Sequence, residues 1–410
     1  MTADLRELVE REAAAAHAAV GELTDEAVTR ALERAAELVD EQSGAIARAN
    51  AADVEAASGR LDEGALDRLR LDPSRIAALR EQLAQLAALP PLDRDEDGWE
   101  LENGLRVRVR RIPIGAVGAN FEARPNVAVD VAGQLLKSLN AAVLRTGGAA
   151  LHTVTTLVDE VLRPALEHAG LPPAAVGLVR SSEREGARVL VSLPHVLPLV
   201  ILRGSGETTA ELAREAAQHG VRTLAHAEGG GVLYIGAAAD AARAQELVEA
   251  SLDRLGVCNR LNLLLVDRAA EEQLPGLLLL LGRLGIAVRE PLRLGHEWAN
   301  DPDPANVASV TVHVVESLDE AVAVANGETS GLAAAIATED EAAAERFLAT
   351  YRGTAAFWNA PTRFTDGFAL TGSPETGINV DRVPGPRGPV TYRDLWLRQY
   401  RVVGDGTQRR

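Results

Sequence analysis

Apolar side chains recur at every third or fourth position through the first part of the chain. Alanine, leucine and valine follow this spacing over 5–20, 27–50 and 74–88, with glutamate and arginine at many of the positions between them. A period of 3.6 residues predicts amphipathic helices. The acidic segment 93–97 ends this helical region.

The spacing changes to two residues at 105–111. Leu105, Val107 and Val109 alternate there with arginines, which is typical of a strand with one buried and one exposed face. Two interpretations stay open: a solvated edge strand, or a β-arm that pairs with a neighbouring subunit. The segment 392–403, which carries tyrosine, tryptophan and arginine, is a second candidate for intersubunit pairing.

From residue 112 onward, short apolar runs alternate with helical segments. The runs at 114–119, 141–146, 176–179 and 197–202 predict the strands of one α/β unit, and those at 232–235, 261–266, 286–289, 307–315, 331–337 and 354–358 predict a second. Repeated strand–turn–helix units form parallel sheets covered by helices on both faces. Ligands of such sheets bind beyond the carboxyl ends of the strands.

Capping boxes predict where three of these helices begin. In each box a side-chain hydroxyl accepts a hydrogen bond from the backbone three residues later, where a glutamate reaches back. The three pairs are Ser182 with Glu185, Ser317 with Glu320, and Thr338 with Glu341.

Length, charge and cysteine content narrow the class of protein. A chain of 410 residues is too long for a single core, so two or three domains are expected. The formal net charge of −17 argues against binding to nucleic acid or to an anionic membrane surface. No apolar run is long enough to span a bilayer, and the first residues do not resemble a signal peptide. The single cysteine excludes an internal disulfide and predicts a reducing, cytoplasmic setting.

That cysteine, Cys258, lies between a predicted helix and the apolar run 261–266. A lone cysteine is most often a small buried hydrophobic residue. A thiol on a loop at the edge of a strand, however, can also face a cleft and act as a nucleophile. The residue alone leaves both interpretations open.

Two glycine turns follow predicted strands. Gly147-Gly148 comes after the strand at 141–146, and Arg203-Gly204-Ser205-Gly206 comes after the strand at 197–202. Such turns can present backbone N–H groups to a phosphate, or can simply close a strand–helix unit. Two of them at strand carboxyl ends favour a dinucleotide, although neither is a GxGxxG fingerprint.

Two polar loops carry further candidate chemistry. In Glu122-Ala-Arg-Pro-Asn126, the asparagine could cap the next helix, or its amide could donate to a developing oxyanion. Arg124 could bind a phosphate or carboxylate through two hydrogen bonds. Arg363, with Thr362 and Thr365, forms the second loop. His226 is interpreted as part of a turn rather than as a proton donor.

Two long motifs indicate that these segments belong to one known type of protein. Phe121-Glu-Ala-Arg-Pro-Asn-Val127 and Asn359-Ala-Pro-Thr-Arg-Phe-Thr-Asp-Gly367 are the most specific, and weaker similarity runs along nearly the whole chain. With them the chain resembles the glutamate-5-semialdehyde dehydrogenase (gamma-glutamyl phosphate reductase) family of the aldehyde dehydrogenase superfamily. Cys258-Asn259 falls where that family places its nucleophile.

The resemblance implies an α/β fold of the aldehyde dehydrogenase type, with two Rossmann-like parallel-sheet lobes and a small β-arm for oligomerisation. We expect residues 1–97 and 112–226 to form the cofactor-binding domain, and 227–366 to form the catalytic domain that carries Cys258. Residues 98–111 and 385–410 are expected to be the oligomerisation arms, with 367–384 as a returning linker. A homo-oligomer, either dimer or tetramer, is therefore expected.

The implied reaction is the NADPH-dependent reduction of L-glutamate 5-phosphate to L-glutamate 5-semialdehyde, a step of proline biosynthesis. The Cys258 thiolate would attack this small anionic acyl phosphate, release phosphate and form a thioester, with no metal. Asn126 and the backbone N–H of Cys258 would stabilise the oxyanion. The resemblance assigns the substrate to Glu122, Arg124, Asn259, Arg363 and Thr365, and the cofactor to Lys137, Arg145, Gly147, Gly148, Gly204 and Ser205.

Departures from the family leave alternatives open. The family usually has Arg-Gly-Gly-Lys where this chain has Arg145-Thr-Gly-Gly148 followed by alanine, so NADH remains an alternative to NADPH. Segments before Cys258 and around Ser330 also differ from the family pattern. The second hypothesis is therefore a related acyl-phosphate or thioester reductase, or an aldehyde dehydrogenase, with another substrate. A third is a catalytically silent relative.

Overall fold

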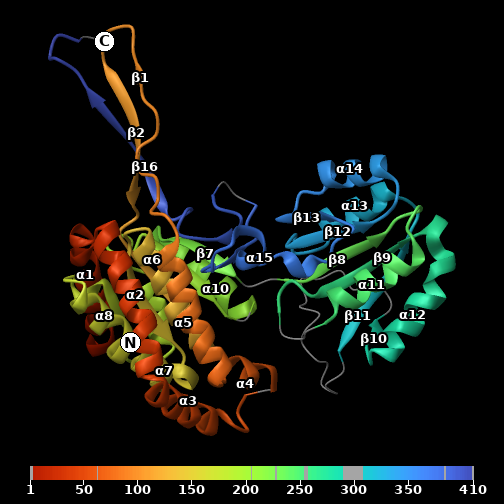
Figure 1. The fold of residues 1–410 in the computed structure, drawn as a ribbon, viewed down its shortest axis with the longest axis horizontal. Coiled ribbons are helices and arrows are strands. Elements are labelled where there is room, and N and C mark those ends of the chain that lie inside the picture. Colours follow the sequence, from red (N-terminus) through yellow and green to blue (C-terminus); the bar gives the residue numbers. More distant parts are fainter. Residues whose placement is uncertain are drawn as a thin grey trace. The chain divides into compact units, whose positions relative to one another are not determined.

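The computed structural model describes residues 3–61, 63–204, 206–226, 229–253, 257–289, 308–382 and 385–408. The chain forms two compact units (Figure 1). The first unit contains Met1–Ala225, Ser373–Gly377 and Val390–Arg410, and the second contains His226–Gly372 and Ile378–Pro389. Within the described ranges no helix has the length and apolar content needed to cross a membrane.

A five-stranded sheet forms the centre of the first unit. Its strand order is β5-β4-β3-β6-β7, and β3 pairs in parallel with both β4 and β6. Every residue of β3 and β4 is buried, because helices cover both faces. The strands are β3 (Ala116–Phe121), β4 (Ala141–Thr146), β5 (Val176–Leu178), β6 (Leu199–Arg203) and β7 (Arg222–His226).

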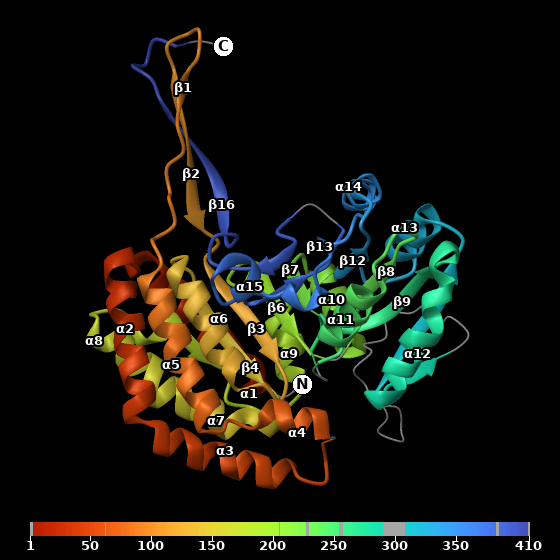
Figure 2. The same cartoon turned by 45° about the vertical axis from the view of Figure 1, so that its right-hand side comes forward.

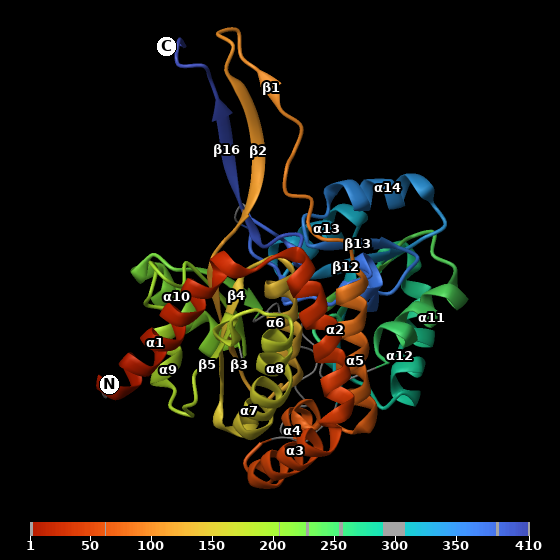
Figure 3. The same ribbon diagram turned by 60° about the vertical axis from the view of Figure 1, so that its left-hand side comes forward.

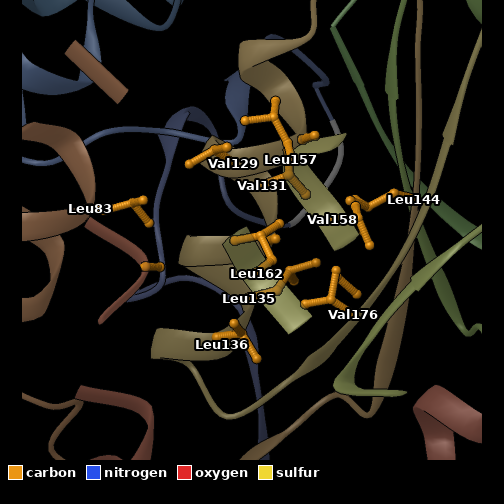
Figure 4. Close-up of a cluster of buried hydrophobic side chains, with 14 of the residues drawn as sticks. Leu83, Val129, Val131, Leu135, Leu136, Leu144, Leu157, Val158, Leu162 and Val176 are labelled. Carbon is orange, nitrogen blue, oxygen red and sulfur yellow. The ribbon is translucent and has the colours of Figure 1, made fainter. Parts of the chain in front are cut away.

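Helices lie on both faces of this sheet (Figure 3), and a separate apolar cluster holds them on each face. One face packs against α1 (Ala3–Ala19), α9 (Glu185–Leu190) and α10 (Gly206–His219). In the other cluster, Leu135 of α6 lies beside Val176 of β5, and Leu144 of β4 lies beside Val158 (Figure 4). The helices on that side, α6 included, are α2 (Asp25–Glu41), α3 (Ser43–Ala57), α5 (Pro73–Ala88), α6 (Asn126–Lys137), α7 (Leu151–Leu157) and α8 (Arg163–His168).

The second unit repeats this layered plan around a six-stranded sheet. Its order is β10-β11-β9-β8-β12-β13, and all the adjacent pairs are parallel. Helices α11 (Ala241–Ser251) and α12 (Leu274–Arg283) cover one face, and α13 (Leu318–Gly327) and α14 (Glu341–Thr350) cover the other (Figure 1). The strands are β8 (Gly231–Ile235), β9 (Leu261–Asp267), β10 (Ala287–Arg289), β11 (Ser309–Val315), β12 (Ala333–Ala337) and β13 (Ala355–Trp358). The α/β fold with two Rossmann-like sheets is confirmed.

A three-stranded antiparallel arm stands away from the helices of the first unit (Figure 2). It consists of β1 (Trp99–Glu100), β2 (Arg106–Pro113) and β16 (Trp396–Val403), with β2 at the centre. Val107 and Val109 are buried in it, as their alternation predicted. Tyr400, which is paired with Val109, is 56% exposed, so the arm presents apolar side chains to solvent.

Several local predictions were wrong. The helix expected over 27–50 is two helices, because α2 ends at Glu41 and α3 starts at Ser43. Neither Ser182 nor Thr338 caps a helix: α9 has Arg184 at its N-cap and α14 has Asp340. Ser317 is confirmed as the N-cap of α13, with Glu320 N donating to Ser317 Oγ, while the Glu320 carboxylate accepts from Glu316 N.

The segment 367–384, expected to be a linker, contains regular structure. Helix α15 (Gly367–Thr371) follows Asp366, and β14 (Gly377–Asn379) pairs with β15 (Gly388–Val390). Helix α4 (Glu63–Leu69) and strand β7 were also not predicted. These elements are short, so their periodicity is too brief to distinguish from a loop.

Candidate active site

Cys258 lies in a turn just before β9 and is half-buried. It packs at the margin of a small apolar cluster formed by Leu332, Ala333 and Ile378. Gly230 N donates to the Cys258 carbonyl over 2.7 Å. A Cβ at Gly229 would come within 3.0 Å of the Cys258 Cβ, so only glycine permits this close approach. The thiol is therefore held on a well-defined loop and is not sealed within the core.

Asn259 ties this turn to the loop 362–365. Its Nδ2 donates to the carbonyl oxygens of Arg363 and Thr365, each over 2.9 Å. The Thr362 hydroxyl donates in return to the Asn259 carbonyl over 2.9 Å. Two motifs that are far apart in the sequence therefore form one structural element around the cysteine. The substrate role predicted for Asn259 remains a proposal, since the structure gives its side chain a bracing role.

Replacing Asn259 with alanine is expected to destabilise the second unit by about 1–3 kcal/mol, because two buried carbonyl groups lose their donor. Urea unfolding followed by tryptophan fluorescence measures the change. Asn262→Ala is the matched control, since Asn262 lies three positions later on β9 and its side chain makes no hydrogen bond within the described ranges. Equal losses in both variants would contradict the bracing role.

Charged side chains surround the same loop. Arg363 Nε donates to Asp253 Oδ1 over 2.6 Å, and its Nη1 donates to Asn259 Oδ1. Arg260 is fully buried, and its Nη1 contacts the Ser309 carbonyl at 3.4 Å. Burial lowers the pKa of Arg260 to about 10, partly opposed by Asp253, so its guanidinium stays charged at neutral pH. The Arg260 guanidinium therefore links the turn that carries Cys258 to β11.

Thr365 completes the loop. Its residue is fully buried, and its hydroxyl has no hydrogen-bond partner among the described residues. A buried hydroxyl without a partner costs free energy unless a ligand or water supplies one. The substrate roles predicted for Thr365 and Arg363 remain proposals.

Within the first unit, the loop between β3 and α6 carries other residues that the sequence predicts to be functional. Ala123 has a φ of 45°, a left-handed conformation that costs alanine about 1–2 kcal/mol. Asn126 is the first residue of α6 and not its N-cap, which is Pro125. The Asn126 side chain instead donates from Nδ2 to Asp130 Oδ2 over 2.9 Å. Arg124 is half-buried in this loop.

Gly147 and Gly148 follow β4 beside two charged residues. Arg145 is 2% exposed, and its guanidinium donates to Asn120 Oδ1 and to the carbonyls of Ser182 and Glu183. A Cβ on Gly147 would lie 3.8 Å from Glu122 Cγ. Burial lowers the pKa of Arg145, and the charge of Glu122 opposes this shift. The structure therefore places Glu122, predicted to bind substrate, beside residues predicted to bind cofactor.

The second glycine turn follows β6. Arg203 is half-buried, and its Nε is shielded from solvent with no hydrogen-bond partner in the described part of the chain. Gly204 comes next, Ser205 lies outside the described residues, and α10 begins at Gly206. A cation and a helix start at the carboxyl end of a strand suit a phosphate. The residues present therefore fit a nucleotide diphosphate.

Lys137 is not brought to this edge of the sheet. It is the last residue of α6, the helix whose first residue is Asn126, and its Nζ donates to the Ala87 carbonyl over 3.2 Å. Burial lowers its pKa. Because α6 runs back from the carboxyl end of β3, Lys137 lies near the opposite end of the strands. Its predicted cofactor role gains no support from this placement.

Three residues of these networks were not predicted. Asp130 lies one helical turn after Asn126, and this spacing of four was a usable signal. Asp253 contacts an arginine 110 positions away, and Arg260 gave no sign of its burial. His226 ends β7, and its Nδ1 is 2.7 Å from the Ile378 carbonyl, while the rest of the turn predicted there, 227–228, lies outside the described residues.

Comparison with known proteins identifies the family. The model of the aldehyde dehydrogenase family matches residues 2–278 and 307–388. A gamma-glutamyl phosphate reductase of Rhodospirillum rubrum is 37% identical over 90% of this chain and 88% of its own length.

Solved structures agree with this match. A crystal structure of gamma-glutamyl phosphate reductase from Thermotoga maritima superposes with a TM-score of 0.88 at 29% identity, covering 98% of this chain and 100% of that one. An engineered glycolyl-CoA reductase with bound NADP+ shares the fold, with a TM-score of 0.71 at 14% identity over 96% of each chain. The chain therefore belongs to the aldehyde dehydrogenase family, in its gamma-glutamyl phosphate reductase branch, and is an NAD(P)-dependent oxidoreductase.

Proposed function

We propose that this enzyme reduces L-glutamate 5-phosphate to L-glutamate 5-semialdehyde and phosphate, a step of proline biosynthesis. The observation that carries the proposal is the bracing of Cys258-Asn259 by the loop 362–365, through Asn259 Nδ2 and Thr362 Oγ1. Both segments belong to the motifs that the chain shares with gamma-glutamyl phosphate reductases. Their contact unites the nucleophile with an arginine and a buried hydroxyl.

In the proposed reaction the Cys258 thiolate attacks the acyl carbon of the substrate. The carbon–oxygen bond to the phosphate breaks, and inorganic phosphate leaves with its electron pair. The resulting thioester stays attached to Cys258. When bound, a reduced nicotinamide supplies the hydride for this thioester. The reduced thioester is a thiohemiacetal, still bonded to Cys258. Its collapse breaks the carbon–sulfur bond, regenerates the thiolate and releases the aldehyde.

Negative charge builds on the substrate oxygen in both addition steps. We propose that the Asn126 side chain and the backbone N–H of Cys258 donate to it. Such donors act on the transition state more strongly than on the ground state. The positive φ of Ala123 supports this role, because strained backbone persists where a precise loop position is useful.

The anionic substrate needs local cations in a protein whose formal net charge is −17. Arg363 is 20% exposed and already pairs with Asp253, so its guanidinium is held in place on the loop beside Asn259. We propose that Arg363 and Arg124 bind the phosphate and carboxylate groups, with Thr365, Asn259 and Glu122 completing the site. Glu122, beside Arg145 and Gly147, would mark its border with the cofactor.

For the cofactor we propose NADPH, with NADH as an alternative and no metal. The backbone of Gly147, Gly148, Gly204 and Ser205 would hold the diphosphate, and Arg145 would shape the adjoining loop by binding the carbonyls of Ser182 and Glu183. The family lysine is absent after Gly148, so selectivity for the 2′-phosphate depends on other cations. Lys137 would act only at a distance, through the packing of α6 against α5.

We further propose that the arm formed by β1, β2 and β16 mediates a homo-oligomer, either dimer or tetramer. Leu397, Tyr400 and Val402 on β16 are each about half exposed. Exposed apolar side chains on an edge strand are a liability unless another chain covers them. A reducing cytoplasmic compartment would suit an enzyme that depends on one thiolate.

The reverse reaction tests the proposed function. Purified enzyme is mixed with L-glutamate 5-semialdehyde, phosphate and either NADP+ or NAD+, and the absorbance of reduced nicotinamide is followed. We expect phosphate-dependent turnover, with a lower KM for NADP+ than for NAD+. Titration of enzyme fluorescence with NADPH and NADH gives the same comparison without turnover.

Other outcomes separate the alternatives. Turnover only with aldehydes such as propionaldehyde would indicate a paralogous reductase or dehydrogenase with another substrate. Its basis would be the segment before Cys258, where Asp253 pairs with Arg363. Failure with every aldehyde, by enzyme that still binds nicotinamide, would indicate a catalytically silent relative.

A further inference from the structure

Asn126 does not stand alone at the start of α6. Its Nδ2 donates to Oδ2 of Asp130, four residues later on the same helix, over 2.9 Å. An asparagine amide has two N–H groups, and a carboxylate offers acceptors only. One N–H of Asn126 is therefore engaged by Asp130, and the direction of the second follows from that contact.

The surroundings of Asp130 are unusual for a carboxyl group. Its Oδ1 is shielded from solvent, and no hydrogen-bond partner for it occurs among the described residues. The charged groups that act on it are Arg203 at the end of β6 and Glu375 in the segment before β14. Burial raises the pKa of Asp130 to about 7, Arg203 lowers it, and Glu375 raises it further. Asp130 thus changes charge near neutral pH.

We propose that Asp130 is a positioning residue that fixes which end of the Asn126 amide faces the reacting carbonyl oxygen. This inference rests on the proposed function, in which Asn126 donates to the oxyanion. An amide can turn by 180° about its last torsion with little change in shape, so an unassisted asparagine presents oxygen as readily as nitrogen. The ionised carboxylate of Asp130 accepts only from the nitrogen end and removes this ambiguity.

Protonation of Asp130 would favour the opposite orientation of the Asn126 amide. A neutral carboxyl group can donate its own proton to Asn126 Oδ1, which stabilises the turned amide and withdraws the donor from the oxyanion. Activity is therefore expected to require ionised Asp130. The arrangement also costs stability, because an ionised carboxylate sits where one oxygen has no donor. A group that destabilises the fold at working pH is typical of functional sites.

The test compares Asp130→Asn with wild type between pH 6 and pH 9. An asparagine at this position keeps the shape but accepts and donates, so it no longer selects one amide orientation. We expect kcat at pH 8 to fall about 10-fold, less than the 10²–10³-fold loss expected for removing an oxyanion donor. KM should change little. The part of the kcat–pH profile that rises near pH 7 should disappear.

Two further measurements distinguish positioning from general damage. The double variant Asn126→Ala/Asp130→Asn should be no slower than Asn126→Ala alone, because Asp130 acts only through Asn126. The pH dependence of Cys258 alkylation by iodoacetamide should be unchanged in Asp130→Asn. Asp53→Asn is the matched control: Asp53 is a buried carboxylate of the first unit that accepts from Thr153, and its replacement should leave kcat unchanged.

Thermal unfolding supplies a readout that does not depend on turnover. The folded-state pKa of Asp130, about 7, lies above its ordinary value, so at this site wild-type stability falls as pH rises toward 7. The Asp130→Asn variant has no carboxyl group at this site, so its stability does not fall in this way as pH rises. Its melting temperature relative to wild type should therefore be higher at pH 8 than at pH 5.

The inference is overturned if Asp130→Asn keeps the wild-type kcat and pH profile, or if its loss adds to that of Asn126→Ala. Either result in an otherwise active enzyme leaves the proposed function intact. Failure of the wild-type enzyme to turn over any aldehyde would overturn both the function and the positioning role.

Discussion

Replacing Cys258 with serine is expected to lower turnover on the order of 10⁴-fold or more, which is the scale seen when a nucleophile is removed. A serine hydroxyl is not ionised at neutral pH, so it is a much weaker nucleophile than a thiolate. The measurement is phosphate-dependent reduction of NADP+ with L-glutamate 5-semialdehyde.

The fold of the serine variant should remain intact. Cys258 is half-buried at the edge of a small cluster, so removing one sulfur changes little packing. Circular dichroism and the melting temperature check this expectation. Because Cys258 is the only cysteine in the chain, alkylation with iodoacetamide must add one label to wild type and none to the variant. A fully active serine variant would contradict the assigned nucleophile and the thioester route with it.

Replacing Asn126 with alanine is expected to lower kcat about 10²–10³-fold, the usual effect of losing one oxyanion donor. KM should change by less, because the charge on the oxygen develops only in the transition state. The loss should also be visible in the first turnover, where thioester formation releases phosphate. Stopped-flow detection of phosphate under single-turnover conditions measures it directly.

A structural asparagine provides the control for Asn126→Ala. Asn326 Nδ2 donates to the Thr350 carbonyl over 3.0 Å, and its Oδ1 accepts from Arg352 N over 2.7 Å. Asn326→Ala should lower stability and leave kcat unchanged. If Asn126→Ala keeps wild-type kcat, or raises KM alone, Asn126 is a ground-state contact, and the oxyanion role must be abandoned.

Hydrophobic periodicity predicted secondary structure correctly wherever one repeat continues over enough residues. The alternation at 105–111 predicted β2, and the apolar run at 141–146 predicted β4 to the residue. Short elements escaped: β7 and α15 span too few residues to show a repeat. The prediction of helix N-caps succeeded only in part, because a hydroxyl followed by a glutamate also occurs in loops, as at Ser182 and Glu185.

The sequence also predicted one part of the candidate site and missed another. Motifs identified Cys258, Asn126 and Arg363 as chemically capable residues, since their types and neighbours are readable from the chain. Motifs could not show that Asn259 binds the backbone of the loop 362–365, or that Asp253 neutralises Arg363. Nor could they show that Lys137 ends α6 with its ammonium on the Ala87 carbonyl.

The sequence by itself determined the class of fold, the family and the identity of the one thiol, because periodic burial and long motifs are local properties of a chain. Only the tertiary structure decided which side chains are already engaged. Asn126 with Asp130, and Asn259 with two carbonyls, acquire their roles from partners, and Arg260 is buried only because the chain folds around it. Hydrogen bonding and desolvation depend on positions in space, which residues far apart in sequence share only after folding.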